Sequence, residues 1–333
     1  MIRVAINGFG RIGRLTLRAL LKNPDIKVVA VNDLTDDATL AHLFKYDSVH
    51  GKYTGEVTAE NKSIIIDGNV IYSYAEKDPA NLPWKELNID VVAECTGLFR
   101  SYDKAVAHID AGAKRVVISA PAKSGNVKSI VLGVNDDILT SDDIVLSNAS
   151  CTTNCVAPMI KVIDELYHVE SGSITTVHAY TGDQRLHDAP HSDLRRARAA
   201  AQSIIPTTTG AAKAVGEILP HLASKLHGYG IRVPVIDGSM TDFTCVVKNP
   251  FEPEDVNAAF KTIAQTTLKG ILEYTEDPIV SADIVGNTHS CIFDAGLTEK
   301  IGDNMLKIVG WYDNEFGYSN RLAELIDKVG KLL

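Results

Sequence analysis

A cysteine at position 151 stands where the chain could generate a nucleophile. It lies within residues 147–155, between the apolar run 143–146 and apolar residues that recur at helical spacing. This pattern predicts a buried strand that passes into a helix at Cys151. Unpaired backbone N–H groups at a helix start carry partial positive charge, which favours a thiolate and could hold a developing oxyanion. Cys151 is therefore a candidate nucleophile, although most free cysteines are small buried hydrophobic residues.

Two further residues of the same stretch bear on its chemistry. Cys155 follows Cys151 by one helical turn, but two cysteines four residues apart, with no nearby histidine pair or second Cys-x-x-Cys, lack zinc-site spacing. We therefore expect no metal. Pro158 falls inside the expected helix, where a proline removes a backbone hydrogen bond, and we expect a kink there.

A glycine-rich motif near the amino terminus has the spacing of a dinucleotide-binding loop. Gly8, Gly10 and Gly13 follow the apolar run 3–6 and open an amphipathic segment, and Asp33 lies 20 residues beyond Gly13 at the end of a second apolar run. The glycines would permit a tight turn, the approach of a pyrophosphate to the backbone, and the packing of helix on strand. Asp33 would then bind ribose hydroxyls.

Later apolar runs continue this alternation of strand and helix. Residues 90–94, 115–119, 130–132 and 143–146 read as strands between helical stretches. The sequence thus predicts an α/β fold with a doubly wound Rossmann-type sheet. Loops at the carboxyl ends of its strands should face the cofactor, and they contain Thr96, Ser119 and finally Cys151. A cysteine beside a nicotinamide suggests oxidation of an aldehyde through a thioester, although other chemistries could use the same parts.

Length and composition narrow the class of protein. A chain of 333 residues that is 45% hydrophobic and 23% charged predicts a globular protein of two domains. The net charge of −9 argues against nucleic acid or an anionic membrane as the main partner. Five scattered cysteines fit a reduced, cytoplasmic protein better than a disulfide scaffold. We expect no secretory signal, and no apolar run reaches membrane-spanning length.

Long ordered segments resemble one known family, the phosphorylating glyceraldehyde-3-phosphate dehydrogenases, over essentially the whole chain. The matching segments are residues 6–14, 147–155, 177–181, 194–200, 205–213, 232–234 and 311–315. The resemblance implies NAD-dependent oxidative phosphorylation of D-glyceraldehyde 3-phosphate to 1,3-bisphosphoglycerate through a cysteine thiohemiacetal and a thioester. It also implies a homotetramer, in which residues 194–200 belong to a loop that reaches an adjacent subunit.

The resemblance assigns roles to individual residues. Cys151 would attack the aldehyde, and His178 would pair with it as general base and acid. By itself, His178 at the end of a β-type run would more usually be a satisfied core histidine. The remaining residues implied for substrate and phosphate are Thr181 and Arg232 for the substrate phosphate, Ser150, Thr209 and Gly210 for inorganic phosphate, and also Thr152 and Arg195.

The resemblance also defines the cofactor site and the domains. The residues implied for NAD are Gly8, Gly10, Arg11, Ile12, Asp33, Lys77, Thr96, Ser119, Asn314 and Tyr318. Asn314 would fix the nicotinamide carboxamide, and Tyr318 would pack near the ring. Residues 1–150, completed by a C-terminal helix 316–333, would form the NAD-binding domain. Residues 151–315 would form an α+β catalytic and tetramerisation domain with a mainly antiparallel sheet.

Some positions leave alternatives to weigh. Ala189-Pro190 is intermediate between patterns of NAD-using and NADP-using relatives, but the carboxylate of Asp33 would repel a 2′-phosphate and so favours NAD. Erythrose-4-phosphate dehydrogenase is the nearest rival, yet it usually lacks the Thr-Gly-Ala-Ala-Lys found at residues 209–213. An aspartate-semialdehyde dehydrogenase would also combine a dinucleotide-binding motif with a catalytic cysteine, but the matching segments are not those of that family. In a non-catalytic binding protein, Cys151 and His178 would have no chemical role.

Overall fold

The computed structural model describes residues 1–333, which divide into two compact units. Unit 1 comprises Met1–Ile130, Asp136–Ala149 and Ser319–Leu333, and unit 2 comprises Val131–Asn135 and Ser150–Tyr318. No helix in the chain combines the length and the apolar character needed to span a membrane. Each unit is built around its own sheet, and the expected fold class is confirmed.

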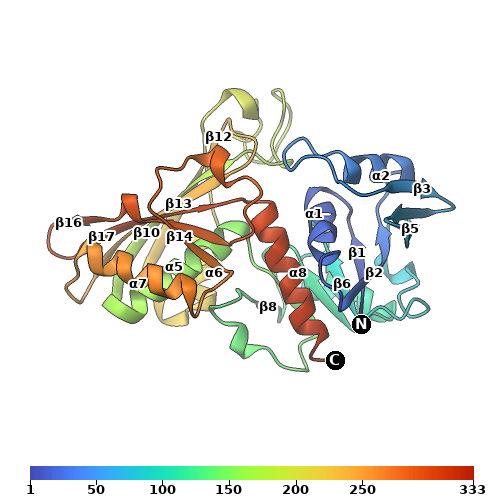
Figure 1. The fold of residues 1–333 in the computed structure, drawn as a ribbon, viewed down its shortest axis with the longest axis horizontal. Helices are drawn as coiled ribbons and strands as arrows, with labels where there is room; N and C mark the ends of the chain where they lie inside the picture. The colour runs from blue at the N-terminus through green and yellow to red at the C-terminus, as the bar shows by residue number, and fades with distance from the viewer. The chain divides into compact units, whose positions relative to one another are not determined.

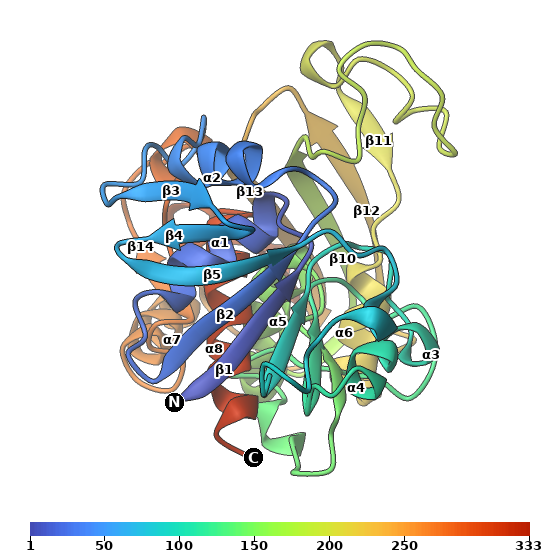
Figure 2. The ribbon, with the colours of Figure 1, turned by 90° about the vertical axis from the view of Figure 1, so that its right-hand side faces the viewer.

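Unit 1 contains a nine-stranded sheet in the order β3-β4-β5-β2-β1-β6-β7-β9-β8, and Figure 2 shows β5, β2 and β1 side by side. Its parallel strands are β1 (Ile2–Asn7), β2 (Ile26–Asn32), β6 (Val91–Glu94), β7 (Arg115–Ile118), β8 (Lys128–Ser129) and β9 (Val145–Ser147), with β5 (Asn69–Tyr74) joined to β2 and the antiparallel β3 (Val57–Glu60) and β4 (Ser63–Ile66) beyond it. The helices are α1 (Arg11–Leu20), α2 (Asp37–Lys45), α3 (Tyr102–Ala105) and α4 (Ala107–Asp110), with α8 (Phe316–Gly330) entering the unit at Ser319.

The central strands of this sheet are buried along their whole length and mostly apolar. Every residue of β6 and β7 is buried, as expected for parallel strands that are covered on both faces. Trp84 is fully buried in the core on one of these faces, beside Val92 and Val116. This core holds the carboxyl ends of β1, β2 and β6 in fixed positions.

One predicted strand does not form. Residues 130–132 were predicted as a strand, but the strand β8 ends at Ser129. The chain turns instead at Val131, because its N–H donates to the Asn135 side chain at 2.8 Å and its carbonyl accepts the N–H of Val134 at 3.0 Å. An apolar run cannot reveal such local capture of the backbone by a side chain.

Unit 2 contains an eight-stranded sheet in the order β11-β12-β10-β13-β17-β15-β14, with β16 paired to β17. Its strands are β10 (Val169–Ala179), β11 (Ile205–Thr207), β12 (Leu226–Val233), β13 (Ser239–Val247), β14 (Leu272–Thr275), β15 (Cys291–Asp294), β16 (Glu299–Ile301) and β17 (Met305–Tyr312). Its helices are α5 (Cys151–Tyr167), α6 (Ala211–Ile218) and α7 (Pro253–Gln265). Most pairings are antiparallel, apart from β10 with β12 and β14 with β15.

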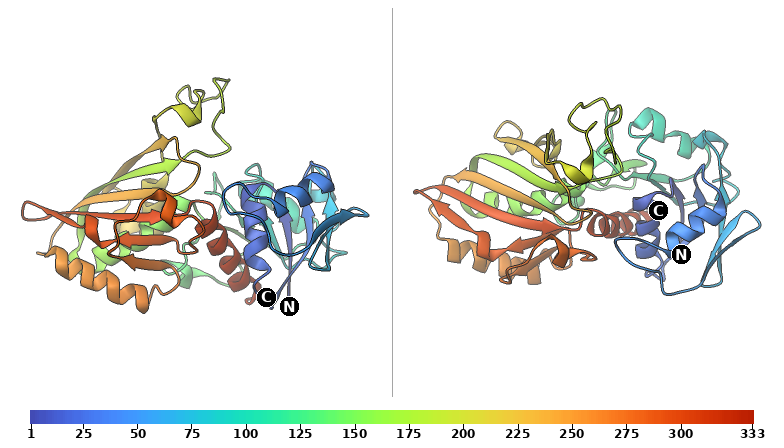
Figure 3. Two further views of the ribbon diagram at one scale, coloured as in Figure 1. Left: turned by 45° about the horizontal axis from the view of Figure 1, so that its top comes forward. Right: turned by 90° about the horizontal axis from the view of Figure 1, so that it is seen from above.

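Helices cover one face of this second sheet. Alternate residues of β13 are buried, which is the pattern of a strand with one face on a core. The helices α5, α6 and α7 lie along that side in Figure 1, and Figure 3 shows α7 beneath the strands in two more views. The core of unit 2 therefore lies between this sheet and α5.

Candidate active site

The nucleophile candidate is the first residue of α5, as predicted. Ser150 caps the helix, since its hydroxyl accepts the N–H of Thr153 at 3.1 Å. The preceding residue, Ala149, has a φ of 52°, a left-handed conformation that costs a non-glycine residue about 1–2 kcal/mol. The sharp turn at Ala149 ends the strand β9 and begins α5 directly at Cys151. The helix then runs on through Pro158 to Tyr167.

The sulfur of Cys151 faces a histidine from a different element. Cys151 Sγ lies 3.4 Å from His178 Nε2, and His178 stands next to the last residue of β10. His178 Nδ1 is 2.7 Å from the carbonyl oxygen of Ala179. Nδ1 thus faces an acceptor, this carbonyl, and a donor, Arg232 Nη1 at 2.8 Å. We assign the ring proton to Nδ1, since the Ala179 carbonyl is the nearer partner and Arg232 Nη1 can donate to the same carbonyl. The Nε2 lone pair is left facing the Cys151 thiol, in position to accept its proton.

A buried arginine completes this cluster. Parallel pairing of β10 with β12 sets His178 opposite Arg232. Arg232 Nη1 donates to the Ala179 carbonyl at 3.0 Å and lies 2.8 Å from His178 Nδ1. The carbonyl thus accepts from both side chains and fixes their relative positions. The remaining guanidinium N–H groups of Arg232 supply a charged fork suited to a phosphate.

Burial shifts the pKa values of both Cys151 and His178. Burial raises the pKa of the Cys151 thiol above its usual value, although Arg232 and backbone N–H groups act in the opposite direction. Burial, assisted by the charge of Arg232, lowers the pKa of His178 to about 3. Burial thus favours the neutral forms of both groups, and it opposes the thiolate that Arg232 and the helix start favour.

Tyr312 packs against His178 and holds the neighbouring threonine hydroxyls. It is 1% exposed, and its hydroxyl lies 2.9 Å from the hydroxyls of both Thr152 and Thr176. Its ring meets the His178 ring edge-on at a centroid distance of 5.9 Å. Because the Thr152 hydroxyl is bound to Tyr312, Thr152 offers a ligand mainly its backbone N–H at the helix start.

The other residues implied for anion binding, Thr209, Gly210 and Arg195, lie in the segment between β10 and α6. Thr209 Oγ1 accepts the N–H of Ala211 at 3.2 Å, and Gly210 precedes the first residue of α6. Arg195 is exposed, and its backbone N–H donates to Asp193. Its neighbour Arg196 instead bonds Thr207 Oγ1 at 2.9 Å, and its charge acts on His178 and Arg232.

Asn314 is oriented by a hydrogen-bond chain that starts at the catalytic strand. Ala179 donates its N–H to Ser239 Oγ at 3.0 Å, and Ser239 donates its hydroxyl to Asn314 Oδ1 at 2.6 Å. Asn314 as a residue is 5% exposed, and its side-chain NH₂ group is left to donate to a ligand. This geometry suits recognition of a carboxamide oxygen. Tyr318 is also buried, at the start of α8.

The glycine-rich loop of unit 1 has the geometry that a dinucleotide needs. Gly8 has a φ of 90°, and a Cβ there would lie 2.6 Å from the Thr96 nitrogen. A Cβ on Gly13 would lie 2.2 Å from the Gly8 oxygen, so helix α1 packs directly on the loop. A Cβ on Gly10 would meet no atom within 4 Å, which leaves room for a pyrophosphate at the start of α1.

A pocket of about 510 Å³ opens beside this loop. Its lining includes five of the residues implied for NAD, namely Gly8, Gly10, Asp33, Lys77 and Thr96. Asp33 closes the loop, because its carboxylate accepts the N–H of Phe9 at 2.8 Å and that of Thr35 at 3.0 Å. The residues present therefore fit a dinucleotide.

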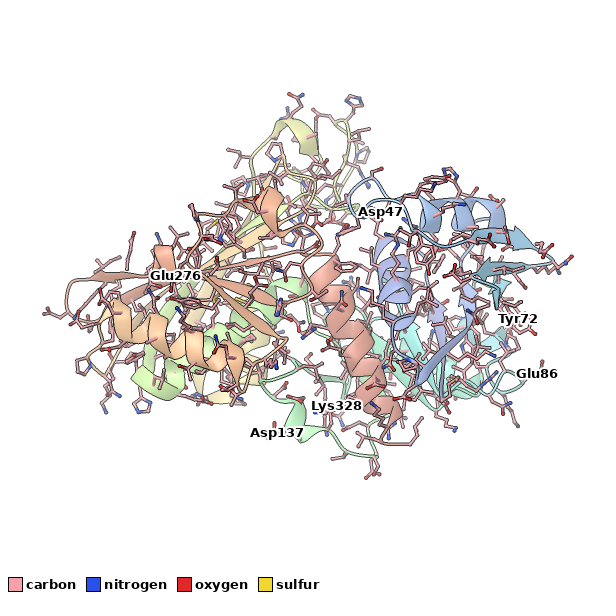
Figure 4. The ribbon with its side chains drawn as sticks, in the orientation of Figure 1. Asp47, Tyr72, Glu86, Asp137, Glu276 and Lys328 are labelled. Atoms are coloured by element: carbon pink, nitrogen blue, oxygen red, sulfur yellow. The ribbon has the colours of Figure 1, made fainter.

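Three other residues implied for NAD lie close to this loop or beside its strands. Arg11 begins α1, and its guanidinium lies 3.2 Å from the carboxylate of Asp47, which follows the end of α2 in the chain and is labelled in Figure 4. Ile12 follows Arg11 in the first turn of α1. Ser119 follows β7, and its N–H donates to the Glu94 carbonyl at 2.9 Å.

Sequence reasoning missed several residues that shape these sites. They are Arg196, Ser239 and Tyr312 in unit 2, and Asp47 and Glu94 in unit 1. Arg196, Tyr312 and Glu94 lie in segments that the sequence distinguishes, residues 194–200, 311–315 and 90–94, but no local pattern showed which partners their side chains would meet.

Comparison with known proteins places the whole chain in one group. Residues 2–102 match the family model for the glyceraldehyde 3-phosphate dehydrogenase NAD binding domain, and residues 150–314 match that for its C-terminal domain. A glyceraldehyde-3-phosphate dehydrogenase of Mycobacterium avium is 55% identical over 339 residues, which cover 100% of this chain and 99% of that protein. The enzyme of that name from Thermotoga maritima is 54% identical over 334 residues, covering 100% of both.

Proposed function

Because the chain belongs to the glyceraldehyde-3-phosphate dehydrogenase family, with NAD as its cofactor, we propose that Cys151 and His178 perform the chemistry. The observation that carries this assignment is the 3.4 Å approach of Cys151 Sγ to a histidine nitrogen that is free to accept a proton. The substrate is glyceraldehyde 3-phosphate; the family models and relatives do not favour erythrose 4-phosphate.

The first step forms a carbon–sulfur bond. His178 Nε2 takes the Cys151 proton as sulfur attacks the aldehyde carbon, and the imidazolium returns that proton to the carbonyl oxygen to give a thiohemiacetal. Backbone N–H groups at the start of α5 stabilise the developing oxyanion. Arg232 and Thr181 hold the substrate phosphate.

The second step oxidises the bound substrate. His178 removes the hydroxyl proton of the thiohemiacetal, and bound NAD supplies the hydride acceptor, which leaves a thioester on Cys151. Asn314 holds the carboxamide of the nicotinamide in this arrangement. Inorganic phosphate, bound at Ser150, Thr209 and Gly210, then attacks the thioester, and 1,3-bisphosphoglycerate leaves as Cys151 departs as a thiolate and takes back the proton held by His178.

The site residues of unit 1 bind the rest of NAD. Gly8 and Gly10 with the start of α1 receive the pyrophosphate, and Asp33 accepts the ribose hydroxyls. We assign residues 1–150 with 316–333 to the NAD-binding domain and residues 151–315 to the catalytic and tetramerisation domain. Five free cysteines support a reducing, cytoplasmic setting.

Exposed apolar side chains support assembly into a homotetramer. Leu186, Leu194 and Ile204 are 77%, 81% and 70% exposed, and they lie in or near residues 194–200, the segment that resembles an intersubunit loop. Large apolar side chains so exposed within one stretch of chain fit a surface that a partner covers. Light scattering at micromolar concentration should give four subunits, and a monomer would contradict the assembly.

One assay tests the proposed function. Purified protein mixed with glyceraldehyde 3-phosphate, phosphate and NAD should produce NADH, and omission of any one reactant should abolish steady turnover. Glyceraldehyde without its phosphate and erythrose 4-phosphate serve as comparison substrates. Faster turnover with erythrose 4-phosphate would overturn the assignment of the substrate.

A further inference from the structure

A buried carboxylate beneath the dinucleotide loop has no role in the steps above. Glu94 ends the strand β6, and its side chain is 0% exposed. Its Oε2 accepts from Asn7 Nδ2 at 2.6 Å and from His108 Nε2 at 3.1 Å, while its Oε1 accepts the N–H of Thr96 at 2.8 Å and also the Thr96 hydroxyl. No lysine or arginine is among these partners, so neutral donors alone satisfy the carboxylate.

The histidine of this cluster has a defined tautomer. Trp84 Nε1 lies 3.0 Å from His108 Nδ1, and an indole nitrogen can only donate. His108 Nδ1 must therefore accept, and the ring hydrogen must sit on Nε2, where it is donated to Glu94. Every neighbour of Glu94 thus presents a hydrogen to it, and the side chain acts purely as an acceptor.

This acceptor sets the direction of hydrogen bonds further away. Since Asn7 turns its NH₂ toward Glu94, its Oδ1 accepts from Asn32 Nδ2 at 2.7 Å. Asn32 Nδ2 also donates to the Glu76 carbonyl at 2.9 Å, and Asn32 Oδ1 accepts the Glu76 N–H at 2.8 Å. A chain of hydrogen bonds therefore links Trp84 to the backbone of residue 76, and its two arms, one through His108 and one through Asn32 and Asn7, both donate toward Glu94.

The end of this hydrogen-bond chain at Asn32 and Glu76 forms a wall of the dinucleotide pocket. Asn7, Asn32, Glu76 and Thr96 all line the pocket of about 510 Å³. Thr96 also supports the loop itself, since the space beside Gly8 is closed by the Thr96 nitrogen. The contacts of Glu94 with Asn7 and Thr96 thus hold two sides of the pocket at once.

We propose that Glu94 is a positioning residue for NAD, whose acceptor-only carboxylate imposes one orientation on the amides and backbone groups that shape the pocket. The inference rests on the dinucleotide site proposed above. A glutamine would keep the size of the side chain but present an NH₂ group to neighbours that are themselves donors. One donor would then lose its partner, or Asn7 and Asn32 would turn over.

The test replaces Glu94 while the rest of the enzyme is kept. For Glu94→Gln we expect the dissociation constant and the KM for NAD to rise about tenfold to a hundredfold. The kcat at saturating NAD and the KM for glyceraldehyde 3-phosphate should change by less than about twofold, because Cys151 and His178 are untouched. Calorimetric titration with NAD and steady-state kinetics supply these values.

A matched control separates this effect from a loss of negative charge. Glu86 is an exposed glutamate of the same unit, labelled in Figure 4 at the surface. Glu86→Gln should bind NAD as the wild type does. His108→Leu, which removes one donor but leaves the carboxylate in contact with Asn7 and Thr96, should weaken NAD binding by no more than about threefold.

The outcomes are distinguishable. A folded Glu94→Gln variant that binds NAD like the wild type, or that loses kcat with an unchanged KM for NAD, overturns the inference. If that variant does not fold, Asn32→Asp decides: it keeps the size of the side chain but removes the NH₂ group that donates to Asn7 Oδ1 and to the Glu76 carbonyl, and wild-type affinity for NAD in it overturns the inference. Failure of the wild type itself to bind NAD would instead refute the proposed dinucleotide site.

Discussion

The two sites of this protein are built in opposite ways. In unit 1, residues 8–13 form most of a phosphate-binding loop within a single turn of chain, and the conformations of Gly8 and Gly13 are required by contacts inside that loop. In unit 2, Cys151, His178 and Arg232 come from a helix and two strands, and only the pairing of β10 with β12 brings the last two together. A loop motif is local, whereas a catalytic cluster depends on strand register.

Their electrostatics differ as well. Glu94 of unit 1 is a buried carboxyl group whose side-chain and backbone partners all donate to it. In unit 2 burial favours the neutral forms of both Cys151 and His178, and the nearby charge of Arg232 acts on each. Substitutions in unit 2 should therefore change the rate of reaction, and those in unit 1 should change the affinity for NAD.

The largest expected effect is on the nucleophile. Cys151→Ser should lower turnover by more than about 10³-fold, because a serine hydroxyl is far less acidic and less nucleophilic than a thiol. Cys155→Ser should retain most activity, since Cys155 is buried one turn further on with its sulfur toward the Gly310 carbonyl at 3.7 Å. Steady-state NADH production on both variants tests this. Equal losses in two folded variants would refute the assignment of Cys151.

The next largest effect concerns proton transfer. His178→Asn should lower kcat by about 10² to 10⁴, because the Cys151 proton then has no acceptor. Labelling of Cys151 by iodoacetamide should also shift to higher pH, because asparagine cannot take the thiol proton that His178 Nε2 accepts, while burial still raises the pKa of the thiol. His227→Asn, at an exposed histidine on β12, is the control. An unchanged labelling profile would mean that His178 is not the partner.

Arg232 should have an intermediate and substrate-dependent effect. Arg232→Ala should lower kcat/KM for glyceraldehyde 3-phosphate by about tenfold to a hundredfold, the value of a charged hydrogen bond. Unphosphorylated glyceraldehyde should lose less. It should still lose some activity, because Arg232 also binds the Ala179 carbonyl and lowers the pKa of Cys151. Kinetics with both substrates decide the matter, and equal proportional losses would show that Arg232 does not bind the substrate phosphate.

The smallest effect is expected in unit 1. Asp33→Ala should narrow the preference for NAD over NADP by about tenfold, because it removes the carboxylate that repels a 2′-phosphate. The kcat with saturating NAD should change little. Asp37→Ala removes a nearby charge at the start of α2 and should leave the preference as it is. Dissociation constants for both cofactors measure this, and a wild type that prefers NADP would contradict it.

Local patterns in the sequence determined the elements that carry both sites. The helix start at Cys151 and the strand–loop–helix at residues 2–20 follow from apolar spacing and from glycine and capping residues, which act over a few positions. The identity of the enzyme also came from the sequence, because long ordered motifs match those of the family. The run 130–132 failed as a strand because Asn135 captures the backbone of Val131.

Only the tertiary structure decided which side chains meet and in what protonation state. Strand register sets Arg232 opposite His178, and a buried tyrosine turns the Thr152 hydroxyl away from ligands. Burial raises the pKa of Cys151 against the effect of the helix start, and solvation depends on everything packed around a group rather than on its neighbours in sequence. For the same reason the role of Glu94 was invisible in the sequence: its partners Asn7, Thr96 and His108 converge on it only in the folded sheet.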